Sequence, residues 1–299
     1  MLVVPSKQML VLDDAEAPDV LVAIPHARSF THKARKLTAV PHGIDESRVL
    51  RNMGLEVPYP MLHYYKWSGL LTPMEHQKET AVFMATHKQA LCLNAPGTGK
   101  TLSMLWAADY LLDMGEVSRV LIIAPLSTLK PVWGSEIMRH FSHRGFNIIQ
   151  GARAKREKLV EDDTVEFSII NHDGFSTMPS KFAGYDLIIY DEATALKSPS
   201  SQRYKKFMKF MTAYSPRLWM LTGTPISQNP TDAWTLARLA GSVTVPQSYT
   251  RFKDMTMKRV SQFRWVPRPE ALTVCKSVLQ PSIRFSLDEC VDIPQTLYV

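Results

Sequence analysis

The chain has 299 residues, of which 45% are hydrophobic and 21% are charged, ordinary values for a soluble globular protein. Lys and Arg exceed Asp and Glu by seven, which fits a polyanionic partner such as nucleic acid and fits a solvated basic surface equally well. The cysteines Cys92, Cys275 and Cys290 form no CxxC pair and no zinc-binding spacing, which indicates reduced thiols in a cytoplasmic protein. The sequence contains no signal peptide and no apolar run of roughly 18 residues that would span a membrane.

Residues 1–68 are predicted to form a small α+β module. Short apolar runs at 19–25 and 36–41 are typical of strands, and residues 46–54 predict a helix that ends at Gly54. The connection between the two strands is basic and contains Arg28, His32, Lys33, Arg35 and Lys36. Such a tip can contact phosphates, but solvated loops have the same composition, so both interpretations stay open.

Residues 69–240 alternate apolar runs with helical stretches. The predicted strands are 90–95, 119–125, 146–150, 167–171, 185–191 and 217–223, and the predicted helices include 100–114, 129–141, 201–213 and 230–240. Continuous apolar strands between helices indicate an α/β domain whose mostly parallel sheet is covered on both faces. Residues 241–299 lose this alternation and predict a helical extension, with helices at 247–255 and 269–280 and a linker that enters an apolar strand at 292–299.

The strongest local motif is Asn94-Ala-Pro-Gly-Thr-Gly-Lys-Thr101, which follows an apolar run and opens a predicted helix. Gly97 and Gly99 allow backbone N–H groups to wrap phosphates at a helix N-terminus. In such a loop Lys100 neutralises the β- and γ-phosphates, and the Thr101 hydroxyl binds Mg²⁺. The strict pattern has glycine where this chain has Asn94.

Two further motifs follow later strands of the predicted sheet. Asp191 and Glu192 end the run 185–191, at the edge where open α/β sheets bind ligands. There Asp191 is expected to hold Mg²⁺ through water, and Glu192 is expected to orient an attacking water. The segment 221–229 follows the last run, and its residues that could sense the γ-phosphate are Thr222, Gly223 and Thr224. Taken alone, each motif also fits ordinary capping or turn chemistry.

Together these motifs resemble the Swi/Snf-type branch of superfamily-two helicases and translocases. The segments that are similar to the family's motifs Q, I, Ia, II and III are 71–77, 95–101, 124–137, 190–205 and 221–234, and 168–175 resembles the segment after motif Ia. They occur in the family's order and cover roughly residues 70–240. The resemblance therefore implies a RecA-like ATPase lobe over 69–240.

The resemblance also implies ligands and residue roles. It implies ATP and Mg²⁺ as cofactors and double-stranded DNA as a partner. The implied nucleotide contacts are Gln77, at the adenine, and Pro96, Gly97, Thr98, Gly99, Lys100 and Thr101, with Lys100, Asp191 and Glu192 catalytic and Thr101 and Asp191 on the metal. The implied DNA contacts are Ser127, Thr128, Lys130, Asn171, His172 and Lys197, and the implied coupling residues are Thr194, Thr222, Gly223 and Thr224. Thr194 stands where the family often has histidine, which puts its coupling role in doubt.

Family members carry a second RecA-like lobe with arginine fingers, and no such block follows the third motif here. Residues 283–294 resemble the segment that precedes that lobe, so the lobe is expected either as a separate polypeptide or as a part removed from this chain. An arginine finger is typically worth about 10³–10⁵ in rate. The sequence therefore predicts Mg·ATP binding with slow hydrolysis.

Three functions fit this sequence to different degrees. The first is the ATP-binding half of a motor that translocates on duplex DNA. The second is a module that grips DNA in a nucleotide-dependent way, or regulates a full-length partner, without motor activity. The third is an unrelated phosphate-loop enzyme such as a small-molecule kinase, against which the combination of motifs argues.

Overall fold

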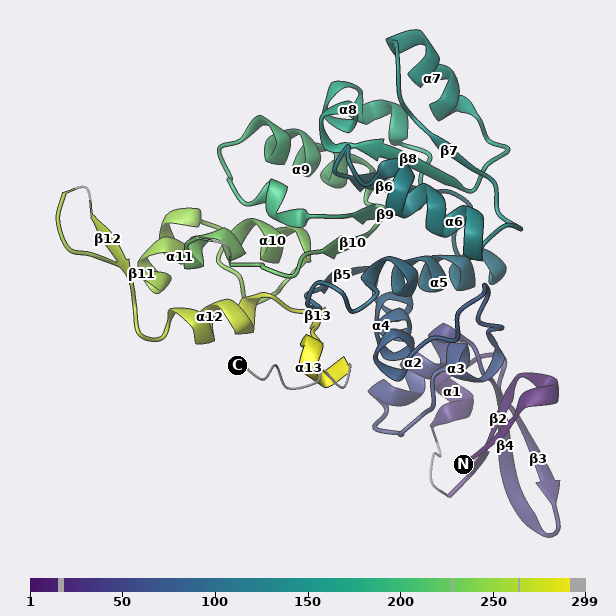
Figure 1. Ribbon diagram of the computed structural model, residues 1–299. Helices are drawn as coiled ribbons and strands as arrows, with labels where there is room; N and C mark the ends of the chain where they lie inside the picture. The colour runs from purple at the N-terminus through teal and green to yellow at the C-terminus, as the bar shows by residue number, and fades with distance from the viewer. Residues whose placement is uncertain (16–18, 227, 263, 291–299) are drawn as a thin grey trace, which may run out of the picture. The chain divides into compact units, whose positions relative to one another are not determined.

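The computed structural model describes all residues except 16–18, 227, 263 and 291–299 (Figure 1). The chain divides into two compact units, Met1–Trp67 and Ser68–Val299. No described helix is long and apolar enough to cross a membrane. Among the described residues, Cys92 and Cys275 are buried free thiols and Cys290 is a half-buried one.

The N-terminal unit is built on an antiparallel four-stranded sheet in the order β1-β2-β4-β3. Its strands are β1 (Leu2–Val4), β2 (Met9–Asp13), β3 (Arg28–His32) and β4 (Arg35–Pro41), and its helices are η1 (Pro5–Lys7, 3-10), α1 (Val20–Ala23), α2 (Ile44–Asn52) and α3 (Pro60–Tyr64). A small core contains Leu10, Leu12, Val20, Ile24, Val40, Leu50 and Val57. The predicted strand at 36–41 and the predicted helix at 46–54 are confirmed.

The predicted strand at 19–25 is wrong, because this segment forms helix α1. A strand would bury alternate residues, yet Val22 is 87% exposed while Val20 and Ile24 are buried. Burial at positions i and i+4 is the pattern of one helical face. The basic residues after it therefore belong to a hairpin: Arg28 and His32 lie in β3, and Arg35 and Lys36 lie in β4.

The larger unit contains a seven-stranded sheet in which every pairing is parallel, in the order β13-β5-β10-β9-β6-β8-β7. Its strands are β5 (Gln89–Cys92), β6 (Val120–Ala124), β7 (Phe146–Ile148), β8 (Phe167–Asn171), β9 (Leu187–Tyr190), β10 (Arg217–Leu221) and β13 (Ser282–Ile283). All six predicted strands are confirmed. They form because their apolar residues can be buried on both faces of a parallel sheet.

Helices cover both faces of this sheet, as Figure 1 shows. The helices up to β10 are α4 (Glu75–Thr86), α5 (Lys100–Asp113), the π-helical turn η2 (Leu129–Gly134), α6 (Ser135–His140), α7 (Arg153–Glu161), α8 (His172–Thr177), η3 (Pro179–Phe182), η4 (Ala193–Leu196) and α9 (Gln202–Tyr214). Helix α5 is buried from Leu102 to Leu111 because it packs closely on α4 and also contacts α6. On the other face, Phe207 and Phe210 of α9 share one core cluster with Ile188 and Tyr190 of β9.

After β10 the chain forms η5 (Pro230–Asp232), α10 (Ala233–Leu239), α11 (Tyr249–Thr256), β11 (Met257–Arg259), β12 (Trp265–Pro267), α12 (Ala271–Val278), β13 and α13 (Leu287–Cys290). The helices predicted near 247–255 and 269–280 are confirmed. The predicted helical extension is incomplete, because it also contains the β11–β12 hairpin and a strand, β13, that pairs with β5. The strand predicted at 292–299 lies outside the described residues.

Candidate nucleotide-binding site

Apart from Gln77 in α4, the predicted site residues follow the carboxyl ends of five strands, β5, β10, β9, β6 and β8. Because all strands of this sheet are parallel, these ends lie along one edge, the usual ligand-binding edge of open α/β sheets. The glycine-rich loop follows β5, and the acidic pair follows β9. Only β10 lies between β5 and β9, so the two motifs are separated by about two strand spacings, or roughly 10 Å.

The loop between β5 and α5 has the geometry of an anion-binding turn. Gly97 and Gly99 have φ values of +83° and +76°, a region that residues with a side chain rarely adopt. Helix α5 begins at Lys100, so its free backbone N–H groups face the loop. The Lys100 ammonium donates to the carbonyls of Asn94 and Ala95, both at 2.9 Å, which folds its positive charge back over the loop.

Helix α4 supports the loop through two adjacent side chains. The imidazole of His76 donates through Nε2 to the Thr98 carbonyl at 2.9 Å, and the Gln77 amide reaches the same carbonyl at 3.4 Å. The Gln77 carbonyl oxygen accepts from the Met74 backbone N–H at 3.0 Å. A Cβ at Gly99 would lie 2.0 Å from Gln77 Nε2, so a side chain at this position would displace the Gln77 amide from the loop. Gln77 thus lies against the loop, and its predicted contact with adenine stays a prediction.

Asn94, the departure from the strict loop pattern, joins three segments of the chain. Its side chain is 1% exposed, and its Nδ2 donates to Thr80 Oγ1 of α4 at 2.9 Å. Its Oδ1 accepts the backbone N–H of Phe285 at 3.0 Å, and the Ala95 N–H donates to the Phe285 carbonyl at 2.9 Å. An asparagine therefore ties the loop to α4 and to the segment after β13, which glycine could not do.

The acidic pair is held by contacts on both sides of Asp191. The indole N–H of Trp133 donates to Asp191 Oδ2 at 3.0 Å, and the Glu192 backbone N–H donates to Oδ1 at 2.9 Å. His172 donates through Nε2 to the Asp191 carbonyl at 2.9 Å and stacks on Tyr190 with ring centroids 4.9 Å apart. Glu192 has φ +50°, a costly conformation for a residue with a side chain, which turns the chain sharply after β9.

Burial and charge determine protonation at this edge. Glu192 is exposed to solvent, but partial desolvation and the neighbouring Asp191 carboxylate raise its pKa, and the Lys100 ammonium acts against that rise. Burial lowers the pKa of His172, so its ring stays neutral and keeps one nitrogen as a donor. The positive charge of Lys100 therefore acts on Glu192. A carboxylate with a raised pKa beside a fixed lysine is a typical arrangement for proton transfer to or from water.

The segment after β10 lies between these two motifs. The Thr222 backbone N–H donates to the Cys92 carbonyl at 3.0 Å, and the Thr224 N–H donates to Thr222 Oγ1 at 3.1 Å. A Cβ at Gly223 would lie 3.0 Å from Pro96 Cδ, so the two loops are in close contact. Thr194 lies in the turn η4 after the acidic pair, where its carbonyl accepts from the Lys197 N–H at 3.1 Å. A displacement of the glycine-rich loop would thus also displace Gly223, because Pro96 of that loop lies against it.

The candidate nucleic-acid contacts lie further along the same edge. Ser127 and Lys130 are exposed after β6, while the Thr128 hydroxyl donates to the Pro125 carbonyl at 3.0 Å. Asn171 and His172 follow β8, and Asn171 is the residue that precedes α8. Lys197 donates to Gln228 Oε1 at 3.3 Å and lies 4.0 Å from an Asp232 carboxylate oxygen. These residues are brought to one edge, but their contact with nucleic acid stays a prediction.

The donor set at this edge suits Mg²⁺. The Thr101 hydroxyl and the Asp191 carboxylate are oxygen ligands, and both residues are half-buried. The described residues contain no group of three or more His, Cys, Asp or Glu side chains that could hold a metal by themselves. Mg²⁺ in nucleotide sites usually has one or two protein ligands, with phosphates and waters completing the shell. The residues present therefore fit a magnesium ion that arrives with a nucleotide.

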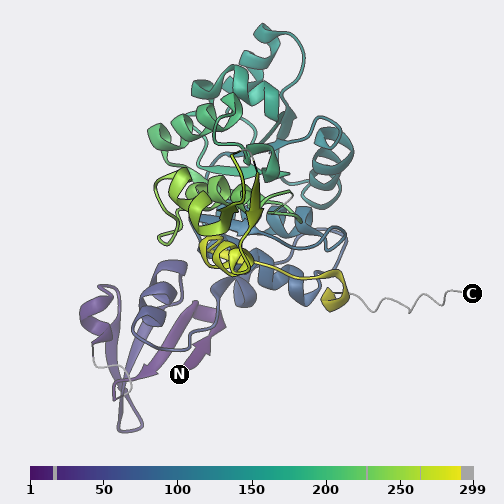
Figure 2. The same ribbon diagram turned by 90° about the vertical axis from the view of Figure 1, so that its left-hand side faces the viewer.

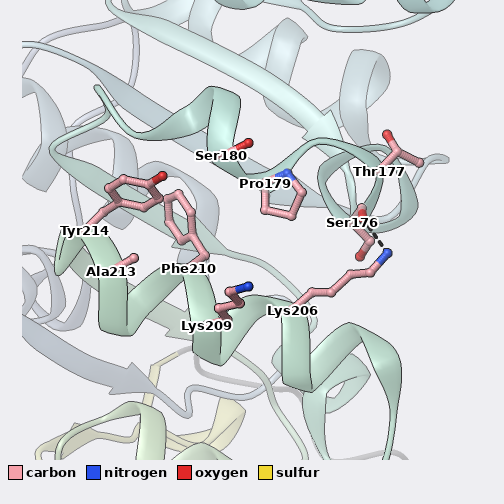
Figure 3. A pocket seen from close by; sticks show the side chains of 9 residues that line it. All are labelled: Ser176, Thr177, Pro179, Ser180, Lys206, Lys209, Phe210, Ala213 and Tyr214. Carbon is pink, nitrogen blue, oxygen red and sulfur yellow. Dashed lines mark hydrogen bonds between the residues drawn. The ribbon is translucent and has the colours of Figure 1, made fainter.

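A separate cavity of about 330 Å³ lies between η3 and α9 (Figure 3). Its lining consists of Ser176, Thr177, Pro179, Ser180, Lys206, Lys209, Phe210, Ala213 and Tyr214. The Lys206 ammonium donates to the Ser176 carbonyl at 2.9 Å, as the dashed line in Figure 3 shows. None of the predicted site residues lines this cavity.

The parallel sheet, its two helical layers and the glycine-rich turn before α5 define a RecA-like nucleotide-binding fold. A family model for the SNF2-related domain matches residues 76–276. The chain belongs to this family, and the resemblance to Swi/Snf-type proteins is confirmed.

Known relatives agree with this assignment, and solved structures agree with the fold. The chain is 30% identical over 173 residues to mouse "Helicase-like transcription factor", covering 54% of the chain and 16% of that relative. It is 29% identical over 145 residues to "ATP-dependent helicase FUN30" of Saccharomyces cerevisiae, covering 44% and 12%. The Sulfolobus solfataricus SWI2/SNF2 ATPase core in complex with dsDNA superposes with a TM-score of 0.60 at 20% identity, covering 73% of this chain and 45% of that one. The chain thus spans a small part of these curated relatives.

Sequence reasoning missed two residues that position this site, His76 and Trp133. His76 directly precedes Gln77 and holds the Thr98 carbonyl. Trp133 lies 58 residues before Asp191 and is completely buried beside it. The only available signal was their place inside the segments that resemble motifs Q and Ia.

Proposed function

We propose that the chain is the nucleotide-binding lobe of a DNA-dependent ATPase that translocates on duplex DNA. The observation that carries the proposal is the meeting of three motifs at one sheet edge. The loop of Lys100, the pair Asp191 and Glu192, and the turn at Gly223 follow strands β5, β9 and β10, which are neighbours in the order β5-β10-β9. The printed names of the relatives, helicases among them, support the same class of activity.

Each residue has a chemical role in this proposal. Lys100 and the N–H groups of the loop bind the β- and γ-phosphates, and Gln77 contacts adenine. Thr101 and Asp191 hold Mg²⁺, which would polarise the phosphates when bound. Glu192 orients the attacking water, and its raised pKa favours the acceptance of a proton from that water. Trp133 and His172 fix the position of Asp191 by hydrogen bonds to its carboxylate and its carbonyl.

The proposal extends to DNA and to a second lobe. Ser127, Thr128, Lys130, Asn171, His172 and Lys197 are proposed to contact the DNA backbone. Members of the family use arginine fingers from a second RecA-like lobe, and the described residues contain one large parallel sheet. We therefore propose that these 299 residues alone hydrolyse ATP slowly, and that a second lobe supplied by other residues raises the rate by about 10³–10⁵.

Equilibrium binding of Mg·ATP and steady-state ATP turnover, with and without duplex DNA, test the proposal. Lys100→Ala should lose ATP affinity, while Lys205→Ala, which removes an exposed lysine of α9, should bind like the wild type. Turnover should stay slow until a second lobe is added. Equal ATP binding by Lys100→Ala and wild type would refute the nucleotide site. Fast DNA-stimulated turnover by this chain alone would refute the need for a second lobe, and turnover that needs a small acceptor and ignores DNA would indicate a kinase.

A further inference from the structure

The N-terminal unit, Met1–Trp67, lies outside the residues that match the family model. Its sheet has two different faces. Leu10 pairs with Val40 and Leu12 pairs with Thr38, and these buried residues form the face on the unit's core. Because side chains alternate along a strand, the residues between them lie on the opposite, open face.

The hairpin of β3 and β4 carries cations and an aromatic ring on this open face. Arg28 pairs with Ala39, Phe30 pairs with Leu37, and His32 pairs with Arg35, so all these side chains share one face. Strand β3 is exposed along its whole length, and Phe30 is 40% exposed. In both views the hairpin extends beyond the helices of its own unit (Figures 1 and 2).

The cations of the open face lack acidic partners. Among the described residues, no carboxylate lies within 4 Å of the charged groups of Arg28, Lys33 or Arg35. By contrast, Lys36 faces the core side, where its ammonium lies 3.4 Å from Asp14. The Thr38 hydroxyl also donates to Asp14, and that hydrogen bond and Lys36 hold the pKa of Asp14 below its ordinary value. Among the described residues, Lys36 is therefore paired with a carboxylate, whereas Arg28, Lys33 and Arg35 are not.

Charge is concentrated in this hairpin. Residues 28–36 contain four of the eight Lys and Arg residues of 1–67 and none of its seven Asp and Glu residues. The unit as a whole is nearly neutral, so its basic character does not come from a general surface excess. A local positive field on an otherwise balanced unit is the electrostatic footprint of a polyanion site.

The turn of the hairpin places one more cation at the tip at a conformational cost. Lys33 and Ala34 have φ values of +47° and +62°, as in a two-residue turn of type I′. Such turns strongly prefer Asn-Gly, because residues with a Cβ lose roughly 1–2 kcal/mol each in this region. Lys33 thus occupies a turn position that asparagine would fill with less backbone strain.

We propose that the open face of the β3–β4 hairpin binds the phosphate backbone of nucleic acid. Arg28, Lys33 and Arg35 contact phosphates, and Phe30 packs against the sugars between them. Residues on one face of a strand repeat about every 6.8 Å, which is about twice the 3.4 Å rise per phosphate along the axis of one DNA strand. Guanidinium groups suit this contact because their forked N–H donors match phosphate oxygens. The site belongs to the N-terminal unit, and the nucleotide edge belongs to the larger unit.

The test is the salt dependence of binding between the full chain and a fluorescent 20-base-pair duplex, measured by anisotropy from 50 to 200 mM KCl. The double variant Arg28→Gln with Arg35→Gln removes two unpaired cations. Lys7→Gln with Lys36→Gln is the matched control, because it removes the same charge from the same unit away from the open face. Both doubles are also made in the Lys100→Ala background, so that failure of the nucleotide site is separated from failure of the hairpin.

The plot of log affinity against log salt has a negative slope, and its steepness should decrease by about 1.8 in the arginine double, at about 0.9 for each lost phosphate contact. Over this salt range that difference amounts to about a 12-fold change in the affinity ratio. The control double should keep the wild-type slope, and so should Ala34→Gly, which relaxes the turn without removing charge. Lys33→Gln should lower the slope by about 0.9 and serves as a second probe if the double is unstable.

Three results would overturn the assignment. An unchanged slope in the arginine double and in Lys33→Gln would show that the hairpin does not contact the duplex, and an equal loss in the control double would reduce the effect to net charge. Displacement of the duplex by polyglutamate as readily as by unlabelled DNA of the same charge would indicate an acidic protein partner instead. If the variants give the same slopes in the Lys100→Ala background, the conclusion about the hairpin does not depend on the nucleotide site.

Discussion

Replacement of Asn94 by alanine should lower the free energy of unfolding of the larger unit by about 2–4 kcal/mol. The change removes the buried hydrogen bond to Thr80, worth about 1 kcal/mol, and leaves the Phe285 backbone N–H without its acceptor, at a cost of about 1–3 kcal/mol. Thr80 adds little more, because its hydroxyl still donates to the His76 carbonyl at 2.6 Å. The loop would keep only the backbone hydrogen bond from Ala95 to the Phe285 carbonyl as a direct link to the segment after β13.

Urea unfolding followed by tryptophan fluorescence measures this effect, because Trp106, Trp133, Trp219, Trp234 and Trp265 all lie in the larger unit. Thr80→Val breaks the same hydrogen bond from the other side. The double variant should therefore be less destabilised than the sum of the singles, by about 1 kcal/mol. A loss below about 0.5 kcal/mol in Asn94→Ala, or an Asn94→Gly variant as stable as the wild type, would refute the linking role of this side chain.

Two further predictions concern the loop and the acidic pair. Gly99→Ala should weaken Mg·ATP binding at least tenfold, because its Cβ would collide with the Gln77 amide, whereas Gly115→Ala, with a similar φ of +69° and open space around it, should bind ATP normally. Equal ATP affinity in both alanine variants would contradict this. Glu192→Gln should raise the thermal midpoint at pH 7, because burial and Asp191 disfavour the charged carboxylate in the folded state. The gain should vanish as the pH falls below the ordinary glutamate pKa of about 4.3, where the wild type is protonated in both states; a gain that persists there would have another cause.

The sequence was sufficient to predict the strands of the large sheet because their burial on both faces requires continuous apolar runs. It was not sufficient for β13, which has two residues and is defined by backbone pairing with β5: the Pro281 and Ile283 carbonyls accept from Leu91 and Leu93. A two-residue segment has no hydrophobic periodicity from which this pairing could be predicted. The strand prediction for 19–25 was wrong because a short apolar run fits a strand and a helix equally well. Only the packing of the segment on the core decides between them.

For the site, the sequence predicted which loops carry the chemistry but not how they are held. The strand order that places β10 between β5 and β9 is a tertiary property, and so is the hydrogen bond from Trp133 to Asp191 across 58 residues. Asn94 could be recognised in the sequence as a departure from the glycine pattern. Its structural role depends on hydrogen bonds to Thr80 and Phe285, which come from segments before and far after the loop.

The central claim is that the glycine-rich loop and the acidic pair hold one metal-bound triphosphate together. A crystal structure of the chain with a non-hydrolysable ATP analogue and Mn²⁺ in place of Mg²⁺ tests it most directly, because the anomalous signal locates the metal. The metal should lie about 2.1 Å from Thr101 Oγ1, with Asp191 linked to it directly or through one water and Lys100 on the terminal phosphates. A triphosphate bound away from the ends of β5 and β9, or a metal that neither Thr101 nor Asp191 contacts, would contradict the account.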